Sequence, residues 1–448
     1  MKRTFLVLPL FLASVLANAQ QKQEMGLEDI FALADQNSQQ IRICETDLEA
    51  FDEAIKSAKS NKLPDVDLSL SGYYIGNANV LSRDFSSSGT TTVAYAIGAG
   101  EIENGTQSSP HWGNNFMVKV SQVIYAGGAI SSGIRMAELG KKMSELNMEK
   151  NRQEVRFALT GQYLELCKLN NQLEVIEKNI ELTEKVLKTM NARQEQGTAL
   201  KTDIIRYELQ LKSLQLSETK LRDAVSIVSN HLAVTLHMPE GTIITPKQDL
   251  SAVDKQEQSY WQNAANENNI SLQQAQLQAD MKSEEVKIAR SEKRPKVAAF
   301  AQDQFVGPYV NDLIPVDANV NSWFIGLGIN YNLGSLWRNN HSVKKAEIIS
   351  RESQEQVQLA NEGIIKAVQA EYVNLQTSYI EVETQQKQVE LANQHYDVTQ
   401  NRYGNGLALL TDMLDASNMK LSADMSLVNA RIDLIFNYYK LKYITSSL

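Results

Sequence analysis

The chain has 448 residues, a formal net charge of −9 and only two cysteines. Mild acidity without a basic block argues against nucleic acid as a partner, and two cysteines are too few for a disulfide framework. The five histidines are scattered along the chain. We therefore expect neither a metal site nor a cofactor.

Residues 1–19 have the three parts of a secretory signal. A basic start at residues 2–3 precedes an apolar run at 5–15, and residues 17–19 form an Ala-Asn-Ala cleavage site. The apolar run is too short to span a bilayer as a helix. We expect the mature chain to begin near Gln20.

The first of two predicted repeats spans residues 20–238. After an initial helix, apolar and polar residues alternate in two predicted strands, 64–75 and 114–125. The stretch between them, 76–110, is rich in Ser, Gly, Thr and Asn and is predicted to be a loop. A long helix then turns at Gly197 into a shorter one.

The second repeat follows the linker 239–254 and has the same order over residues 255–448. Its strands are predicted at 295–305 and 321–333, and its long helix turns at Gly406. Each long helix has about 65 residues, or roughly 100 Å at about 1.5 Å per residue. The two shorter helices of a repeat add up to nearly the same length, so we expect them to stack end to end beside it.

The sequence of the turn between the long and the shorter helix occurs twice in the chain. Residues 193–203 and 402–412 carry Arg, Gly, Ala, Leu, Thr and Asp at the same offsets. A period this long indicates a duplicated half rather than a solenoid of short repeats.

The four strands are about as long as strands that span a bilayer, roughly ten residues. Their predicted lipid-facing residues include Val66, Leu68, Val118, Val120, Ile325 and Leu327. Four strands cannot close a barrel, and an open edge in lipid is costly. Several chains must therefore share one barrel: two would make it too narrow for a duct, whereas three would give twelve strands. The alternative is a small soluble antiparallel sheet packed on helices. Apolar and polar residues would alternate along its strands in the same way.

Several motifs at corresponding places of the two repeats resemble those of the TolC-type outer-membrane efflux family. They are Arg402-Tyr403 with Gly406 and Thr411–Ala416, Gly197–Asp203, Leu63-Pro64, Arg294-Pro295, Gly127-Gly128 and Gly334. The resemblance extends from about Gly26 to Leu448. It implies a mainly α fold with a small β part: a long coiled-coil α-helical barrel, and four antiparallel strands per chain in a shared, trimeric, twelve-stranded transmembrane barrel.

The resemblance also implies a function. The chain would be the outer-membrane exit duct of a tripartite efflux or type I secretion system: a passive homotrimeric conduit that extends into the periplasm. A periplasmic adaptor would connect it to an inner-membrane pump. The alternative is a periplasmic structural coiled-coil protein with a soluble sheet and no transport role. No arrangement typical of an enzyme is present, and the sequence identifies neither the cargo nor the particular pump and adaptor.

Asp412 and Asp415 are three residues apart, which puts both on one face of a helix. The resemblance implies that they line a closed periplasmic aperture together with Tyr403. Three chains would then place six carboxylates around one axis, where they repel one another and attract cations. The alternative is that acids in a first helical turn only favour the helix dipole, with Thr411 as the N-cap. The equivalent Asp203 is expected only to cap its helix or to pair with a basic residue.

The two turns are predicted to contact the adaptor, since an exposed apolar turn usually marks a partner site. Their residues are Gly197, Thr198, Ala199, Leu200, Gly406, Leu407, Ala408 and Leu409. The alternative is burial against a neighbouring turn. Ala408 departs from a well-known family member, in which an arginine at this place ties the closed tip together. Arg402 and Arg206 are the predicted substitutes.

Cys44 and Cys167 are predicted to stay unpaired. At the helical rise they lie about 30 Å and roughly 60 Å from the nearest strands. A disulfide requires Cα atoms within about 7 Å of each other.

Overall fold

The computed structural model describes residues 22–74, 111–197, 200–239, 241–247, 255–310, 315–316 and 318–448. The expected signal segment, the loop at 76–110, part of the linker, and the turn residues Thr198 and Ala199 lie outside the described residues. The chain divides into two compact units, and each takes segments from both predicted repeats. The helical unit comprises 1–51, 140–279 and 352–448, and the sheet unit comprises 52–139 and 280–351.

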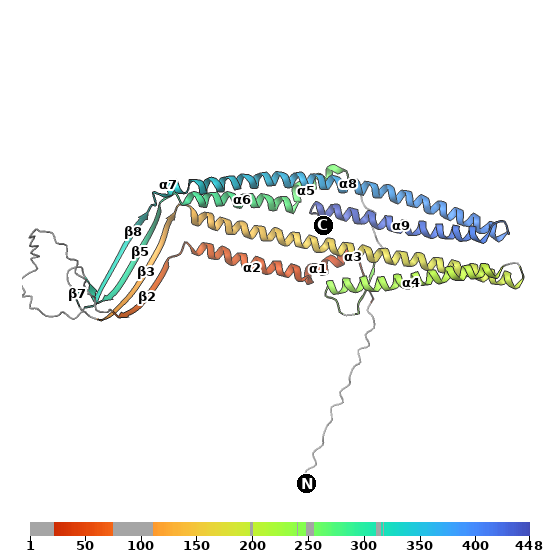
Figure 1. The fold of residues 1–448 in the computed structure, drawn as a ribbon, viewed down its shortest axis with the longest axis horizontal. Coiled ribbons are helices and arrows are strands. Elements are labelled where there is room, and N and C mark those ends of the chain that lie inside the picture. Colours follow the sequence, from red (N-terminus) through yellow and green to blue (C-terminus); the bar gives the residue numbers. More distant parts are fainter. Residues whose placement is uncertain are drawn as a thin grey trace, which may run out of the picture. The chain divides into compact units, whose positions relative to one another are not determined.

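Two long helical hairpins are the main elements (Figure 1). The first is α3 (Ala129–Glu195) with α4 (Lys201–Thr235), and the second is α8 (Asn340–Gly404) with α9 (Leu410–Ile444). Gly197 and Gly406 have φ angles of 75° and 76°. Glycine adopts this left-handed conformation without a steric penalty, which is why each helix ends where it does.

A break between two short helices occurs at the same place in both repeats. The helices are α1 (Leu27–Asn37), α2 (Gln39–Ser60), α5 (Gln258–Asn268) and α6 (Ile270–Ser291). The Asn37 amide donates to the Leu236 carbonyl, at 3.2 Å, where α4 ends. The Asn269 amide donates to the Ile444 carbonyl, at 2.8 Å, at the end of α9. Each bond satisfies a terminal helix carbonyl. It also joins the helix before the strands of a repeat to the helix after its turn, which is the end-to-end arrangement that the helix lengths predicted.

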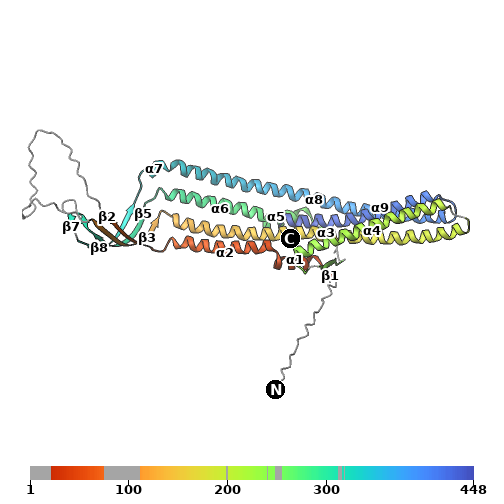
Figure 2. The same cartoon turned by 60° about the horizontal axis from the view of Figure 1, so that its bottom comes forward.

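The largest apolar core of the helical unit lies between α1, α3, α4 and α9. Two short parallel strands, β1 (Lys22–Met25) and β4 (Ile243–Pro246), pack on it (Figure 2). The buried Tyr163 hydroxyl lies 3.3 Å from the carbonyl oxygens of both Met25 and Lys247. Tyr163 therefore ties the two strands to α3.

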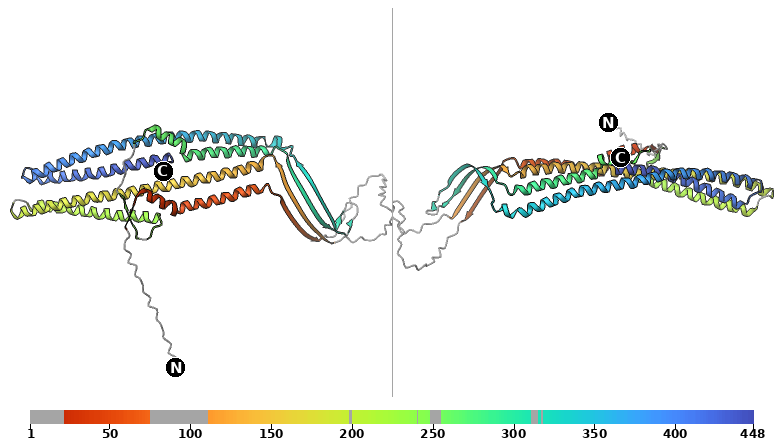
Figure 3. Two further views of the ribbon diagram at one scale, coloured as in Figure 1. Left: turned by 180° about the vertical axis from the view of Figure 1, so that it is seen from behind. Right: turned by 90° about the horizontal axis from the view of Figure 1, so that it is seen from above.

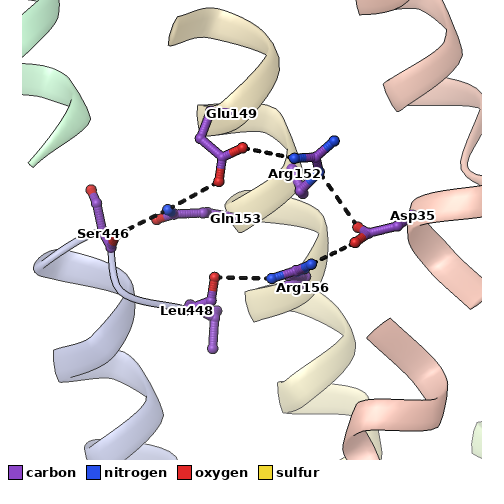
Figure 4. Close-up of polar contacts among 7 residues, drawn as sticks. All are labelled: Asp35, Glu149, Arg152, Gln153, Arg156, Ser446 and Leu448. Carbon is purple, nitrogen blue, oxygen red and sulfur yellow. Dashed lines mark hydrogen bonds and ion pairs between the residues drawn. The ribbon is translucent and has the colours of Figure 1, made fainter. Parts of the chain in front are cut away.

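Charged side chains on α3 hold α1 and the C-terminal segment in place (Figure 4). Arg156 pairs with Asp35 of α1, and its other nitrogen donates to the Leu448 carbonyl at 3.2 Å. Gln153 donates to the Ser446 carbonyl, also at 3.2 Å. These contacts join both ends of the described chain to one stretch of α3.

The sheet unit contains four antiparallel strands in the order β2-β3-β5-β8 (Figure 3). They are β2 (Asp65–Tyr74), β3 (Trp112–Ala126), β5 (Lys296–Gly307) and β8 (Val320–Asn330). The last strand ends earlier than the predicted 333, because Ser335 donates to the Asn332 carbonyl and starts the short helix α7 (Ser335–Arg338). The stretch predicted as a loop after β5 contains a two-residue ladder, β6 (Tyr309–Val310) with β7 (Pro315–Val316).

The strand register places all six predicted lipid-facing residues on one face of the sheet. The cross-strand pairs are Val66 with Val120, Leu68 with Val118, Ala301 with Val120 and Ile325, and Ala299 with Leu327. Since directly opposed residues point to the same side, these pairs form one mainly apolar face, which also carries Asp303 opposite Val118 and Gln122 opposite Ala299. The other face carries Asp65, Asp67, Lys119, Gln302 and Gln304. Among the helices of the described ranges, none is both long and apolar enough to cross a membrane.

Both cysteines are unpaired, as predicted, and both are buried. Burial raises the pKa of the Cys167 thiol to about 12. Very little thiolate therefore exists near pH 8, and we expect Cys167 to resist alkylation in the folded protein. Intact-mass measurement should show two adducts only after denaturation. Rapid labelling of native Cys167, or a disulfide under non-reducing conditions, would contradict this packing.

Candidate functional site at the hairpin turns

The predicted site residues lie where the two hairpins of the helical unit turn (Figures 1 and 2). Next to the turns, side chains from α3, α4, α8 and α9 form one apolar cluster, which we call the turn cluster. Its buried members are Leu187, Met190, Ile204, Tyr207, Tyr396, Leu410, Met413 and Ala416. The hairpins of the two repeats therefore pack against each other within one chain.

Both turns expose large apolar side chains beyond this cluster. The exposed fractions are 68% for Leu200, 69% for Leu407 and 70% for Leu409. Ala408 between them is half-buried. Burial against the neighbouring turn, the alternative for these positions, does not cover the three leucines within this chain.

Asp412 and Asp415 are both exposed in the first turns of α9. The Asp412 carboxylate accepts a hydrogen bond from the Leu409 backbone N–H at 3.0 Å. Asp412 therefore helps to cap α9, whereas Thr411 is not the N-cap, because α9 begins at Leu410 with Leu409 as its N-cap. The Asp415 carboxylate makes no hydrogen bond or ion pair with any described residue. The aperture assignment of both acids stays a prediction.

Tyr403 is half-buried and packs on the turn cluster. The Arg193 guanidinium carbon lies 5.9 Å from the centre of its ring. Burial raises the pKa of Tyr403, the negative charge of Asp203 raises it further, and Arg193 opposes both effects. Tyr403 is thus neutral at physiological pH and lies between an acid of α4 and a base of α3.

Tyr207 is a member of the turn cluster that sequence reasoning did not single out. Its side chain is 2% exposed. Its hydroxyl oxygen has no hydrogen-bond partner among the described residues, and burial raises its pKa. The available signal was helical spacing, since Tyr207 lies three residues after the buried Ile204 on the same face of α4.

Within one chain, neither predicted substitute for the family arginine joins the two turns, and their role in the closed tip stays a prediction. Arg402 and Arg206 are exposed, and neither side chain has a hydrogen bond or ion pair to the described residues. Arg193, in the last turn of α3, instead donates to the Gly404 carbonyl at 2.8 Å. A local pattern could not reveal this contact, because it connects different repeats.

The two halves of this fold correspond to one known family. A family model described as "Outer membrane efflux protein" matches residues 31–236 and 261–444. The chain belongs to the outer membrane efflux protein family. This membership sets aside the alternative of a periplasmic structural protein without a transport role, and it places the chain in the outer membrane.

Individual members of the outer membrane efflux family match different lengths of this chain. Outer membrane protein TolC of Vibrio cholerae is 20% identical over 99% of this chain and 95% of that protein. TolC of Salmonella enteritidis is 24% identical, but the match covers 41% of this chain and 38% of that protein. The crystal structure of outer membrane protein VceC from Vibrio cholerae has a TM-score of 0.74 at 16% identity, covering 94% of this chain and 96% of that one. These comparisons agree with the predicted fold class: a mainly α chain of two repeats with a small antiparallel sheet.

Proposed function

We propose that three copies of this chain form a passive exit duct through the outer membrane. A periplasmic adaptor would connect the duct to an inner-membrane pump in a tripartite efflux or type I secretion system. The observation that carries the proposal is a mainly apolar sheet face whose two border strands each pair with one strand of the described residues, on a member of an outer-membrane efflux family.

The open edges favour a shared barrel. β2 and β8 each have one neighbouring strand in the four-stranded sheet. Within lipid, every unpaired backbone N–H or C=O group costs several kcal/mol. Pairing β8 of one copy with β2 of the next removes this cost, and three copies close twelve strands around one axis.

Exposed apolar side chains on the helices support contacts between copies. Pairs of apolar residues spaced by seven lie on both α4 and α8. They are Leu209 and Leu216, and Ile227 and Val234, on α4, and Val373 and Ile380, and Leu391 and Val398, on α8. All of them are more than half exposed in the single chain. Spacing by sevens is typical of a coiled-coil seam. We assign these stripes to helix packing between neighbouring subunits.

The hairpin turns provide the periplasmic end of the proposed duct. Leu200, Leu407 and Leu409 offer an apolar surface suited to an adaptor, and Asp412, Asp415 and Tyr403 are assigned to the aperture. No group in this assignment requires a cofactor, because the duct only provides a path for cargo that the pump moves.

The experiment is purification from outer membranes followed by mass measurement and planar-bilayer recording. We expect a detergent-dependent complex of three chains that conducts ions without added metal or nucleotide. A monomer that extracts without detergent and forms no channel would refute the proposal.

A further inference from the structure

We propose that Arg193 is a positioning residue that fastens the α3–α4 turn to the α8–α9 turn. It would thereby present the exposed leucines of both turns as one docking surface. The occupant is an apolar surface of a periplasmic adaptor; this part of the inference rests on the proposed function, whereas the fastening itself does not.

The backbone of α8 explains why Arg193 is needed. The last four carbonyl groups of a helix have no partner within it. In α8, the carbonyls of Asn401, Arg402 and Tyr403 accept hydrogen bonds from the N–H groups of residues 405, 407 and 406, respectively. The fourth carbonyl, that of Gly404, accepts from Arg193 of the other repeat at 2.8 Å. The end of α8 is therefore completed by a side chain from α3.

Electrostatics favour the same contact. A helix C-terminus carries partial negative charge, so a cation there is stabilising. The Arg193 guanidinium also lies near the Tyr403 ring, with 5.9 Å between its central carbon and the ring centre. Arg193 thus binds the last turn of α8 through two separate features, the Gly404 carbonyl and the face of Tyr403.

The duplicated sequence provides an internal comparison. Arg193 and Arg402 each precede the turn glycine by four residues. Arg193 is half-buried between the hairpins, whereas Arg402 is exposed, and its side chain has no hydrogen bond or ion pair to the described residues. Two arginines in equivalent local sequences therefore have different environments, and only Arg193 reaches the other repeat.

The position of the contact gives it a role that the turn cluster does not have. The turn cluster packs the helices together on both sides of the turns through apolar side chains, and the Gln210–Asn418 hydrogen bond of 3.0 Å lies further along α4 and α9. Arg193 adds a polar contact at the turns themselves, because it joins the last turn of α3 to the last carbonyl of α8. This contact would help to fix the placement of Leu200 relative to Leu407.

The fastening is tested by hydrogen exchange on the full-length protein in detergent. In Arg193→Met, amides of residues 405–407 should exchange at least about tenfold faster, because opening free energies set exchange rates. Arg193→Lys keeps a charged donor and should remain close to wild type, and the matched control Arg402→Met should be unchanged. Equal protection in Arg193→Met and Arg402→Met would overturn the proposal.

The docking surface is tested in cells with benzoylphenylalanine placed at Leu200 or at Leu409. We expect both positions to crosslink to the same periplasmic adaptor. Arg193→Met should reduce both yields several-fold, and Arg402→Met should reduce neither. Crosslinks to different proteins, or a loss at one position only, would overturn the single surface. If no crosslink forms in the wild type while the exchange result holds, the adaptor contact fails and the fastening stands.

Discussion

Replacing Val118 with arginine is expected to prevent stable assembly of the protein in the outer membrane. Val118 lies in the interior strand β3, opposite Leu68 and Asp303, on the mainly apolar face of the sheet. The Asp303 carboxylate can offset part of the cost of an arginine at Val118, whereas Leu327 lies opposite Ala299. An arginine on the lipid side of a barrel costs about 2–4 kcal/mol near mid-bilayer, and a trimer would carry three. The measurement is the yield and thermal stability of the detergent-purified complex.

The matched control is the next residue along the chain. Met117 lies opposite Ser69 and Gln304 on the polar face. Because side chains alternate along a strand, Met117→Arg places the same charge at nearly the same height but on the other side. We expect it to assemble normally, and Leu327→Arg to fail as Val118→Arg does. Equal stability of all three variants would favour a soluble sheet.

The second large effect concerns ion conduction through the proposed aperture. In a planar bilayer the wild type should prefer cations and be blocked by multivalent cations added from the periplasmic side. Replacing both Asp412 and Asp415 with Asn removes the repulsion between carboxylates and the field that attracts cations. The double variant should lose most of the block while still forming the same complex.

The structure allows this experiment to separate the aperture from helix capping. Asp412 accepts the Leu409 N–H, and an asparagine oxygen can accept it nearly as well. Asp415 has no such contact in the described part of the chain, so Asp415→Asn alone should weaken the block without affecting the start of α9. Asp203→Asn, at the equivalent place in the first repeat, should leave the block unchanged. Full block in a folded double variant would refute the aperture assignment.

The sequence predicted the elements that have a local pattern of residues. Alternation of apolar and polar residues located the four strands and sorted Val66 and Ile325 to the same face, and glycine located the two turns. The division into compact units was not predictable in this way. The repeats follow the order of the chain, whereas each unit combines segments of both repeats.

Long-range contacts account for what the sequence left open at the turns. Arg193 and Arg402 have the same local context, and only the packing of one hairpin on the other gives Arg193 its acceptor at Gly404. Thr411 looked like an N-cap by residue type, yet α9 begins one residue before it. Residue type shows which side chains could cap a helix or bind a carbonyl, whereas tertiary contacts determine which of them does so.

The asparagine joints at Asn37 and Asn269 have a mechanical consequence. In each repeat a continuous helix lies beside a column made of two separate helices, whose adjoining ends share one amide–carbonyl bond. Bending or twisting a continuous helix strains many hydrogen bonds at once, whereas few hydrogen bonds join the helices at each break: one at Asn37, and at Asn269 a second from the Ile270 N–H to the Ser446 hydroxyl at 3.2 Å. In each repeat we therefore expect the continuous helix, α3 or α8, to resist bending, and the interrupted column beside it to yield at Asn37 or Asn269. We expect displacements that begin at the turns before α4 and α9 to concentrate at these two joints.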